Sequence, residues 1–210
     1  MTVVSGIVNP ISNVSIADGT LSNAFLQGKA GELITSELRG KYFTAAYRGQ
    51  VFTTSVPAAS TLTIPTTLAS LASKYCLVNP AGSGKVMELI RTDFYIASAT
   101  EVVNVLGWTK STLVTAGLGT LTAGVINSTL LNGPAQTNVG VFYTAATHTD
   151  TPVWCKSLVG VNATAVGLFV DSFIYDGTFL LYPGNCIDLV ASTGAQANSL
   201  VDTVWAEFPI

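Results

Sequence analysis

Charged residues are scarce in this sequence of 210 residues, where Asp, Glu, Lys and Arg together make up 10% of the chain. A typical soluble domain has about 25%. The mean hydropathy is +0.50, which excludes intrinsic disorder, because disorder requires high charge and low hydropathy. So few charges do little to keep a single copy in solution. We therefore expect copies of the chain, or a partner protein, to cover much of its exterior; the alternative is a monomer coated with Thr, Ser and Asn.

Basic residues are not clustered, and 9 Lys and Arg against 12 Asp and Glu give a net charge of −3. Nucleic-acid binding requires a basic stripe that neutralises phosphates, so we expect no nucleic-acid partner. Residues 1–28 contain no cation, and a secretory signal begins with basic residues, so none is expected. Residues 111–149 carry no Asp, Glu, Lys or Arg. Their many Gly and hydroxyl residues make them too polar to span a membrane, so no membrane partner is expected.

Histidine and cysteine are nearly absent: His148 is the only histidine, and Cys76, Cys155 and Cys186 form no C-x-x-C pair. An odd number of cysteines without a disulfide framework indicates synthesis in a reducing compartment, with the thiols as small buried apolar groups. One disulfide stays open as an alternative. Because a zinc site needs several His or Cys ligands, we predict no metal and no cofactor. We expect His148 to lie in an exposed loop.

The acidic residues show no catalytic signature. No paired-carboxylate or G-x-S-x-G pattern is present, so we predict that the protein is not an enzyme. Glu88 and Glu207 have the most apolar neighbours in sequence, and we expect each to be hydrogen-bonded or paired with Arg91 or Lys85 in a sheet.

Oxygen-ligated calcium is a further alternative, because four aspartates lie in the C-terminal third of the chain. They lack loop spacing, which favours turn or surface roles. These residues are Asp171, Asp176, Asp188 and Asp202.

The clearest pattern in the chain is a strand, a tight loop and a longer strand over residues 74–96. Pro80, Gly82 and Gly84 interrupt two runs of strand-forming residues. The loop lacks the full phosphate-binding pattern and a following helix, so we interpret it as a hairpin loop. In the second strand the apolar positions change parity, which predicts a bulge near Arg91–Asp93 or burial of both faces.

The remaining chain predicts an all-β fold of eight to ten strands, a sandwich or a barrel. We expect two parts, residues 1–39 with an extended arm and one short helix at 31–39, and a β-sandwich at 40–210. Strand-forming residues begin at Lys41, and 66–73 could form a helical turn. Asp176-Gly177 predicts a hairpin between strands at 166–175 and 179–182. The other strands are expected at 51–54, 61–64, 102–108, 139–145, 186–191 and 200–208. A charge-free stretch lies at 113–126, and 153–158 could form a further strand.

The last segment of the chain resembles a known family. It consists of a Pro183-Gly184 turn, an apolar strand, a loop and the ending Trp205-x-Glu207-x-Pro209. This arrangement is similar to the closing strands of jelly-roll virion proteins of tailed bacteriophages. Segments at 40–42, 48–49 and 79–85 are also similar, so the resemblance covers residues 40–209. It implies a jelly-roll fold and a homotrimeric virion component that is assembled in the host cytoplasm. The resemblance first implies a head decoration (cement) protein, which contacts the major capsid protein or another virion protein. Its second implication is a tail or fibre protein.

Four aromatic residues are the interface candidates: Trp108, Trp154, Tyr182 and Trp205. Such residues anchor cores and protein interfaces. As an alternative they would form a sugar-stacking platform in a carbohydrate-binding module. A β-sandwich hydrolase with a deep acidic cleft is the other alternative.

Overall fold

The computed structural model describes residues 40–55, 61–66, 72–96, 103–112, 122–131, 137–148, 152–161 and 169–210. The chain divides into two compact units, Met1–Phe43 and Thr44–Ile210. The predicted arm and the predicted helix at 31–39 lie outside the described residues. In the described ranges no helix is long and apolar enough to cross a membrane.

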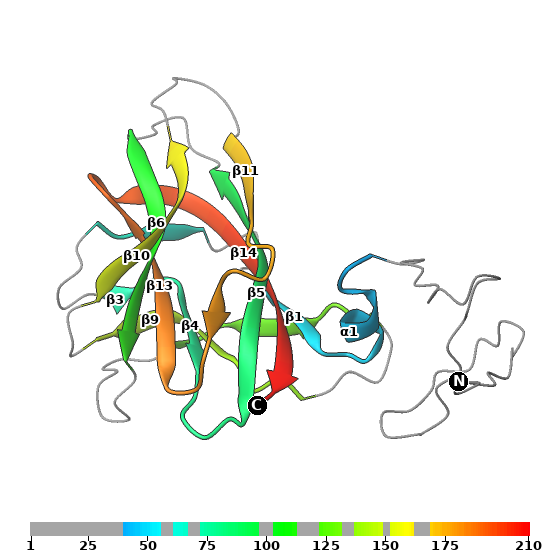
Figure 1. Cartoon of the computed structure of the whole chain (residues 1–210). Helices are drawn as coiled ribbons and strands as arrows, with labels where there is room; N and C mark the ends of the chain where they lie inside the picture. The colour runs from blue at the N-terminus through cyan, green and yellow to red at the C-terminus, as the bar shows by residue number, and fades with distance from the viewer. Residues whose placement is uncertain are drawn as a thin grey trace, which may run out of the picture. The chain divides into compact units, whose positions relative to one another are not determined.

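The described residues form one short helix and a series of strands (Figure 1). The first elements are α1 (Phe43–Tyr47), β1 (Val51–Ser55), β2 (Leu62–Ile64), β3 (Ala72–Ser73), β4 (Cys76–Asn79) and β5 (Lys85–Ile96). The middle elements are β6 (Asn104–Thr112), β7 (Thr122–Ala123), β8 (Val125–Ser128), β9 (Val141–Thr147) and β10 (Val153–Val161). The last are β11 (Phe169–Ile174), β12 (Leu180–Leu181), β13 (Asn185–Ala191) and β14 (Gln196–Pro209).

The strands form two antiparallel sheets. One has the order β11-β5-β14-β1-β8, with β12 and β2 at its sides, and we call it the β14 sheet. The other has the order β10-β6-β13-β4-β9-β3, with β7 beside β9, and we call it the β13 sheet. The quartets β11-β5-β14-β1 and β10-β6-β13-β4 have the strand order of a jelly roll. The expected fold class is therefore confirmed.

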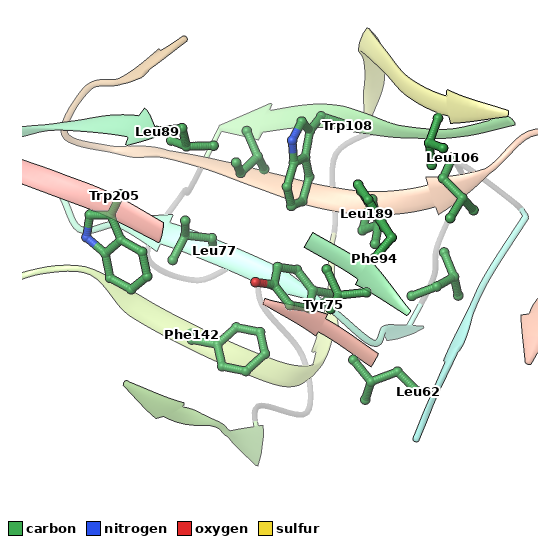
Figure 2. Close-up of a cluster of buried hydrophobic side chains, with 14 of the residues drawn as sticks. Leu62, Tyr75, Leu77, Leu89, Phe94, Leu106, Trp108, Phe142, Leu189 and Trp205 are labelled. Atoms are coloured by element: carbon green, nitrogen blue, oxygen red, sulfur yellow. The ribbon is translucent and has the colours of Figure 1, made fainter. Parts of the chain in front are cut away.

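The core lies between the two sheets and is filled from both of them. Leu89, Phe94 and Trp205 come from the β14 sheet, whereas Trp108 and Leu189 come from the β13 sheet, and all are at most 1% exposed (Figure 2). Alternate residues of a strand point to opposite faces, so residues such as Leu77 on β4 and Ile187 and Leu189 on β13 reach this core from every second position.

Buried hydroxyl groups inside the core are satisfied. The hydroxyl of Tyr175 accepts a hydrogen bond from Nε1 of Trp108 at 2.5 Å and contacts Oγ1 of Thr92 at 2.8 Å. The hydroxyl of Tyr75 contacts Oγ1 of Thr54 at 2.5 Å. These bonds join side chains from both sheets and fix how the sheets face each other.

The predicted bulge in the long strand is confirmed, one residue before the expected range. In the pairing of β14 with β5, Val204 lies opposite Arg91 and Trp205 opposite Leu89, so Ile90 is the extra residue. The bulge shifts the parity, which lets Met87 and Phe94 both face the core.

The Asp176-Gly177 turn forms, but the predicted hairpin is wrong. Both residues have positive φ, 49° and 74°, as the sequence predicts, and Thr178 N donates to Tyr175 O at 3.0 Å. However, β11 and β12 both pair with β5, at Arg91–Ile96 and at Met87–Glu88. The turn is therefore a loop beside the Ile90 bulge, after which the chain returns to the same edge of β5.

Three further local expectations are corrected. Residues 80–84 are not a hairpin loop, because β4 belongs to the β13 sheet and β5 to the β14 sheet. Gly82 and Gly84 do have the expected positive φ. Phe43–Tyr47 is helical rather than extended, and Ala72–Ser73 is a strand rather than part of a helical turn.

Glu207 on β14 joins the end of the chain to the segment before β9. Its side chain is 0% exposed and lies 3.3 Å from Nζ of Lys85, the predicted partner. It also accepts hydrogen bonds from the backbone N–H groups of Val139 and Gly140 and from Nε1 of Trp205. A Cβ at Gly140 would lie 2.8 Å from Cε of Met87 and 3.3 Å from Oε1 of Glu207, so a larger residue here would have to displace the end of the Met87 side chain.

We expect Glu207→Ala to reduce the free energy of unfolding by about 3–5 kcal/mol, because it leaves buried N–H donors without an acceptor. Urea unfolding at neutral pH measures this change. Asp171→Ala, which removes an exposed carboxylate on β11, should change stability by less than about 0.5 kcal/mol. Equal effects of the two substitutions would contradict the role given to Glu207.

Stability at alkaline pH should depend on Tyr175. Burial raises the pKa of Tyr175 from 10.0 to about 12, against the lowering effect of its bonds to Thr92 and Trp108. Below pH 10 the phenol is protonated in both states, and between pH 10 and 12 only the unfolded chain ionises. This group should therefore reduce stability by about 1.4 kcal/mol per pH unit in that window.

The Tyr175→Phe variant should lack that part of the slope in urea unfolding measured from pH 9 to 12. Thr92→Val removes the hydroxyl that contacts Tyr175 and Thr203 but keeps the phenol, so it should lower stability at neutral pH and retain the slope. An unchanged slope in Tyr175→Phe would show that the phenol does not titrate in this way.

Candidate metal centre

The outer face of the β13 sheet carries a buried group of polar side chains. Leu77, Ile187 and Leu189 point into the core. Because side chains alternate along a strand, Cys76, Cys186 and Asp188 point to the opposite face. All three are nevertheless at most 1% exposed, so β13 is buried on both sides.

Strand register brings these side chains together. Asp188 on β13 lies opposite Cys76 on β4, and Cys186 lies opposite Ser111 on β6. Side chains of directly opposed residues are in contact range in an antiparallel sheet. The hydroxyl of Ser111 lies 2.7 Å from Sγ of Cys186.

His148 follows β9 directly and completes the group. Its Nε2 lies 2.9 Å from Oδ1 of Asp188, and its Nδ1 lies 3.0 Å from Oγ of Ser111. The residue is 5% exposed, so the expectation of an exposed loop histidine is wrong. Spacing along the chain could not show this, because the partners of His148 come from β6 and β13.

The contacts change the acidity of the three titrating side chains. Burial lowers the pKa of His148, but hydrogen bonds to Asp188 and Cys186 and the charge of Asp188 outweigh it and raise the pKa to about 10. A hydrogen bond from Cys76, reinforced by His148 and Ser111 against burial, lowers the pKa of Cys186 to about 6. The same contact with Cys186, together with burial, raises the pKa of Cys76.

This geometry favours ligand binding over catalysis. Ser111, His148 and Asp188 form a hydrogen-bonded series that resembles a nucleophile, base and orienting acid. Each is at most 5% exposed, so none has a surface from which to attack a substrate. By contrast, one ligand atom from each of Cys76, His148, Cys186 and Asp188 lies within 4.8 Å of the others.

The third cysteine lies apart from this group. Cys155 on β10 is exposed and donates to the backbone oxygen of Trp108 at 3.2 Å. All three cysteines are free thiols. The expectation of buried thiols is therefore confirmed for Cys76 and Cys186 and wrong for Cys155.

The aromatic interface candidates divide into two kinds. Trp108 and Trp205 are 0% exposed and belong to the core (Figure 2), so neither has surface to offer a partner. Tyr182 is 54% exposed. Trp154 is partly exposed, and its ring covers Gly107, where a side chain would meet the indole at 2.3 Å.

The predicted aspartates do not assemble. Asp171 is exposed on β11, Asp176 lies in the turn before β12, and Asp202 lies on β14. Among the described residues, only Asp188 of the four belongs to a group that could hold a metal ion.

Comparison with known proteins identifies no family for this chain. No family model matches the chain, and neither the curated proteins nor the solved structures contain a match.

Proposed function

We propose that this protein is a non-enzymatic structural component of a virion, a homotrimeric decoration (cement) protein that stabilises a bacteriophage head. The observation that carries the proposal is the jelly-roll strand order of the two sheets. Capsid domains are one of the groups that use this architecture, together with lectins and cupins. Because a fold alone does not specify a function, the proposal also depends on the surface.

The sandwich has an apolar edge that suits association. β11 and β10 each lie at the end of a sheet, where a strand leaves backbone groups unpaired. Val170 and Ile174 on β11 are 52% and 62% exposed, and Val153 on β10 is 56% exposed. We call this the β10/β11 edge. Lys156 and Asp171 are the charged residues of these two strands.

A trimer suits these properties for two reasons. Closed three-fold symmetry covers the same apolar edge on every copy. A trimeric protein that binds across a joint between shell subunits also gains from avidity, since each copy adds a contact to the same particle. In this proposal the partners are the chain itself and the major capsid protein.

The carbohydrate-binding alternative has less support in the described surface. A sugar platform requires exposed aromatic rings, and two of the three tryptophans are fully buried. The hydrolase alternative requires an accessible acid pair, whereas Glu207 is occupied by four donors inside the protein.

We expect the purified full-length protein to have the mass of a trimer in light scattering or native mass spectrometry. A Val170→Lys/Ile174→Lys double variant should be monomeric and remain folded, because it places charges on the β10/β11 edge. Val125→Lys is the matched control: Val125 is 51% exposed on β8, at the other end of the same sheet. A wild-type monomer would overturn the trimer.

Location within particles tests the function itself. Electron cryo-microscopy of purified particles should place the protein on the outside of the head, across joints between shell subunits. Particles that lack it should lose their contents at a lower temperature. Density at the tail would instead support the tail or fibre alternative, and absence from the particles would overturn a virion role.

A further inference from the structure

Two buried side-chain oxygens of the β13 sheet, Oγ of Ser73 and Oδ2 of Asp188, have no hydrogen-bond partner among the described residues. Oδ1 of Asp188 pairs with Nε2 of His148, but Oδ2 has no hydrogen bond within the described part of the chain, although the side chain is only 2% exposed. Leaving a buried carboxylate oxygen without a partner costs free energy. A cation bound by this carboxylate would pair its negative charge.

The side chains next to that oxygen are of types that bind metal ions. Cys76 and Cys186 are 0% exposed, and His148 and Asp188 are at most 5% exposed. We propose that Cys76, His148, Cys186 and Asp188 bind one Zn²⁺ ion, which ties β4, β13 and the end of β9 together. This inference does not depend on the proposed function.

The ligand types select the ion by their softness. Two thiolates and an imidazole suit zinc and related borderline metals, whereas calcium and magnesium require oxygen ligands. Four side-chain ligands without an open position are the pattern of a structural zinc site rather than a catalytic one. The burial of the site agrees with a structural role.

The distances between the ligands are close to those a tetrahedral site needs. Zinc bonds of about 2.0–2.3 Å place neighbouring ligands about 3.3–3.8 Å apart. The four ligand atoms lie within 4.8 Å of one another, so the most distant pair has to approach by about 1 Å. Rotation of the side chains supplies such a movement without a change in strand register.

Ser111 fixes which nitrogen of His148 binds the ion. Nε2 faces Asp188, and Nδ1 faces Oγ of Ser111. With zinc on Nε2, the Nδ1 proton is donated to Ser111, whose own hydroxyl proton is donated to Sγ of Cys186. Such outer contacts orient metal ligands and set the histidine tautomer. Ser111 is therefore a positioning residue.

A divalent cation offsets most of the negative charge at the site. Zinc binding requires both cysteines as thiolates and Nε2 of His148 without a proton, and the protons that these groups carry are released to water. Two thiolates and one carboxylate then carry three negative charges against two positive charges, which leaves a net charge of −1. Attraction between these opposite charges offsets part of the cost of burying them.

Zinc content of the full-length protein tests this inference. The protein is produced without a histidine tag in zinc-supplemented medium, and metal is measured by mass spectrometry after gel filtration. We expect about one zinc per chain in wild type and less than about 0.1 in Cys186→Ser and in His148→Asn. Cys155→Ser, which changes the one cysteine outside the site, should keep about one.

Two measurements on wild-type protein keep the test valid if a variant does not fold. A chelator should lower the melting temperature by about 8–16 °C relative to protein with zinc at 1,000 times Kd. Cobalt in place of zinc should give an intense thiolate-to-metal charge-transfer band and tetrahedral visible bands.

Three results would overturn the proposal. One is wild-type protein that takes up no zinc on dialysis and whose melting temperature a chelator leaves unchanged. Another is zinc that remains in the Cys76→Ser/Cys186→Ser double variant. The third is a cobalt form without thiolate bands.

Discussion

Burial of β13 on both faces is the constraint on which the rest of the structure depends. Every residue from Cys186 to Ala191 is buried. On one side, Ile187 and Leu189 fill the space between the sheets. On the other side the strand presents Cys186 and Asp188, and a buried carboxylate is stable only with partners. Oδ1 of Asp188 pairs with His148 at the end of β9, and His148 in turn contacts Ser111 on β6. On β4, Cys76 lies directly opposite Asp188.

The proposed virion role and the zinc site describe different parts of the molecule. A decoration protein needs a rigid sandwich with apolar edges, because flexible partners lose free energy when they are ordered on binding. The Tyr175 and Glu207 networks and the outer cluster of the β13 sheet supply rigidity at three places. The exposed residues of the β10/β11 edge supply apolar surface. Among the described acidic residues, Asp93, Asp188 and Glu207 are buried, and Glu207 binds the backbone of Val139 and Gly140.

Local properties of the fold could be predicted from the sequence, whereas the pairing of strands with one another could not. The bulge followed from the parity of Met87 and Phe94, and the turn at Asp176-Gly177 followed from residues that accept positive φ. Whether the two strands beside a turn pair with each other depends on contacts with the rest of the sheet, which the local sequence does not show. The hairpins expected at 80–84 and at Asp176-Gly177 therefore did not form. The metal ligands illustrate the same limit. The alternation Cys186-x-Asp188 places two ligands on one face, but nothing in the sequence indicates that Cys76 lies opposite Asp188 or that His148 turns inward.

X-ray absorption at the zinc edge on the full-length protein tests the account of β13 most directly, because it measures the ligand atoms themselves. The structure predicts two sulfur ligands at about 2.3 Å and two nitrogen or oxygen ligands at about 2.0–2.2 Å. A coordination shell of oxygen or nitrogen alone, or purified protein that contains no zinc, would contradict this prediction. The outer face of β13 would then be a hydrogen-bonded network without a metal.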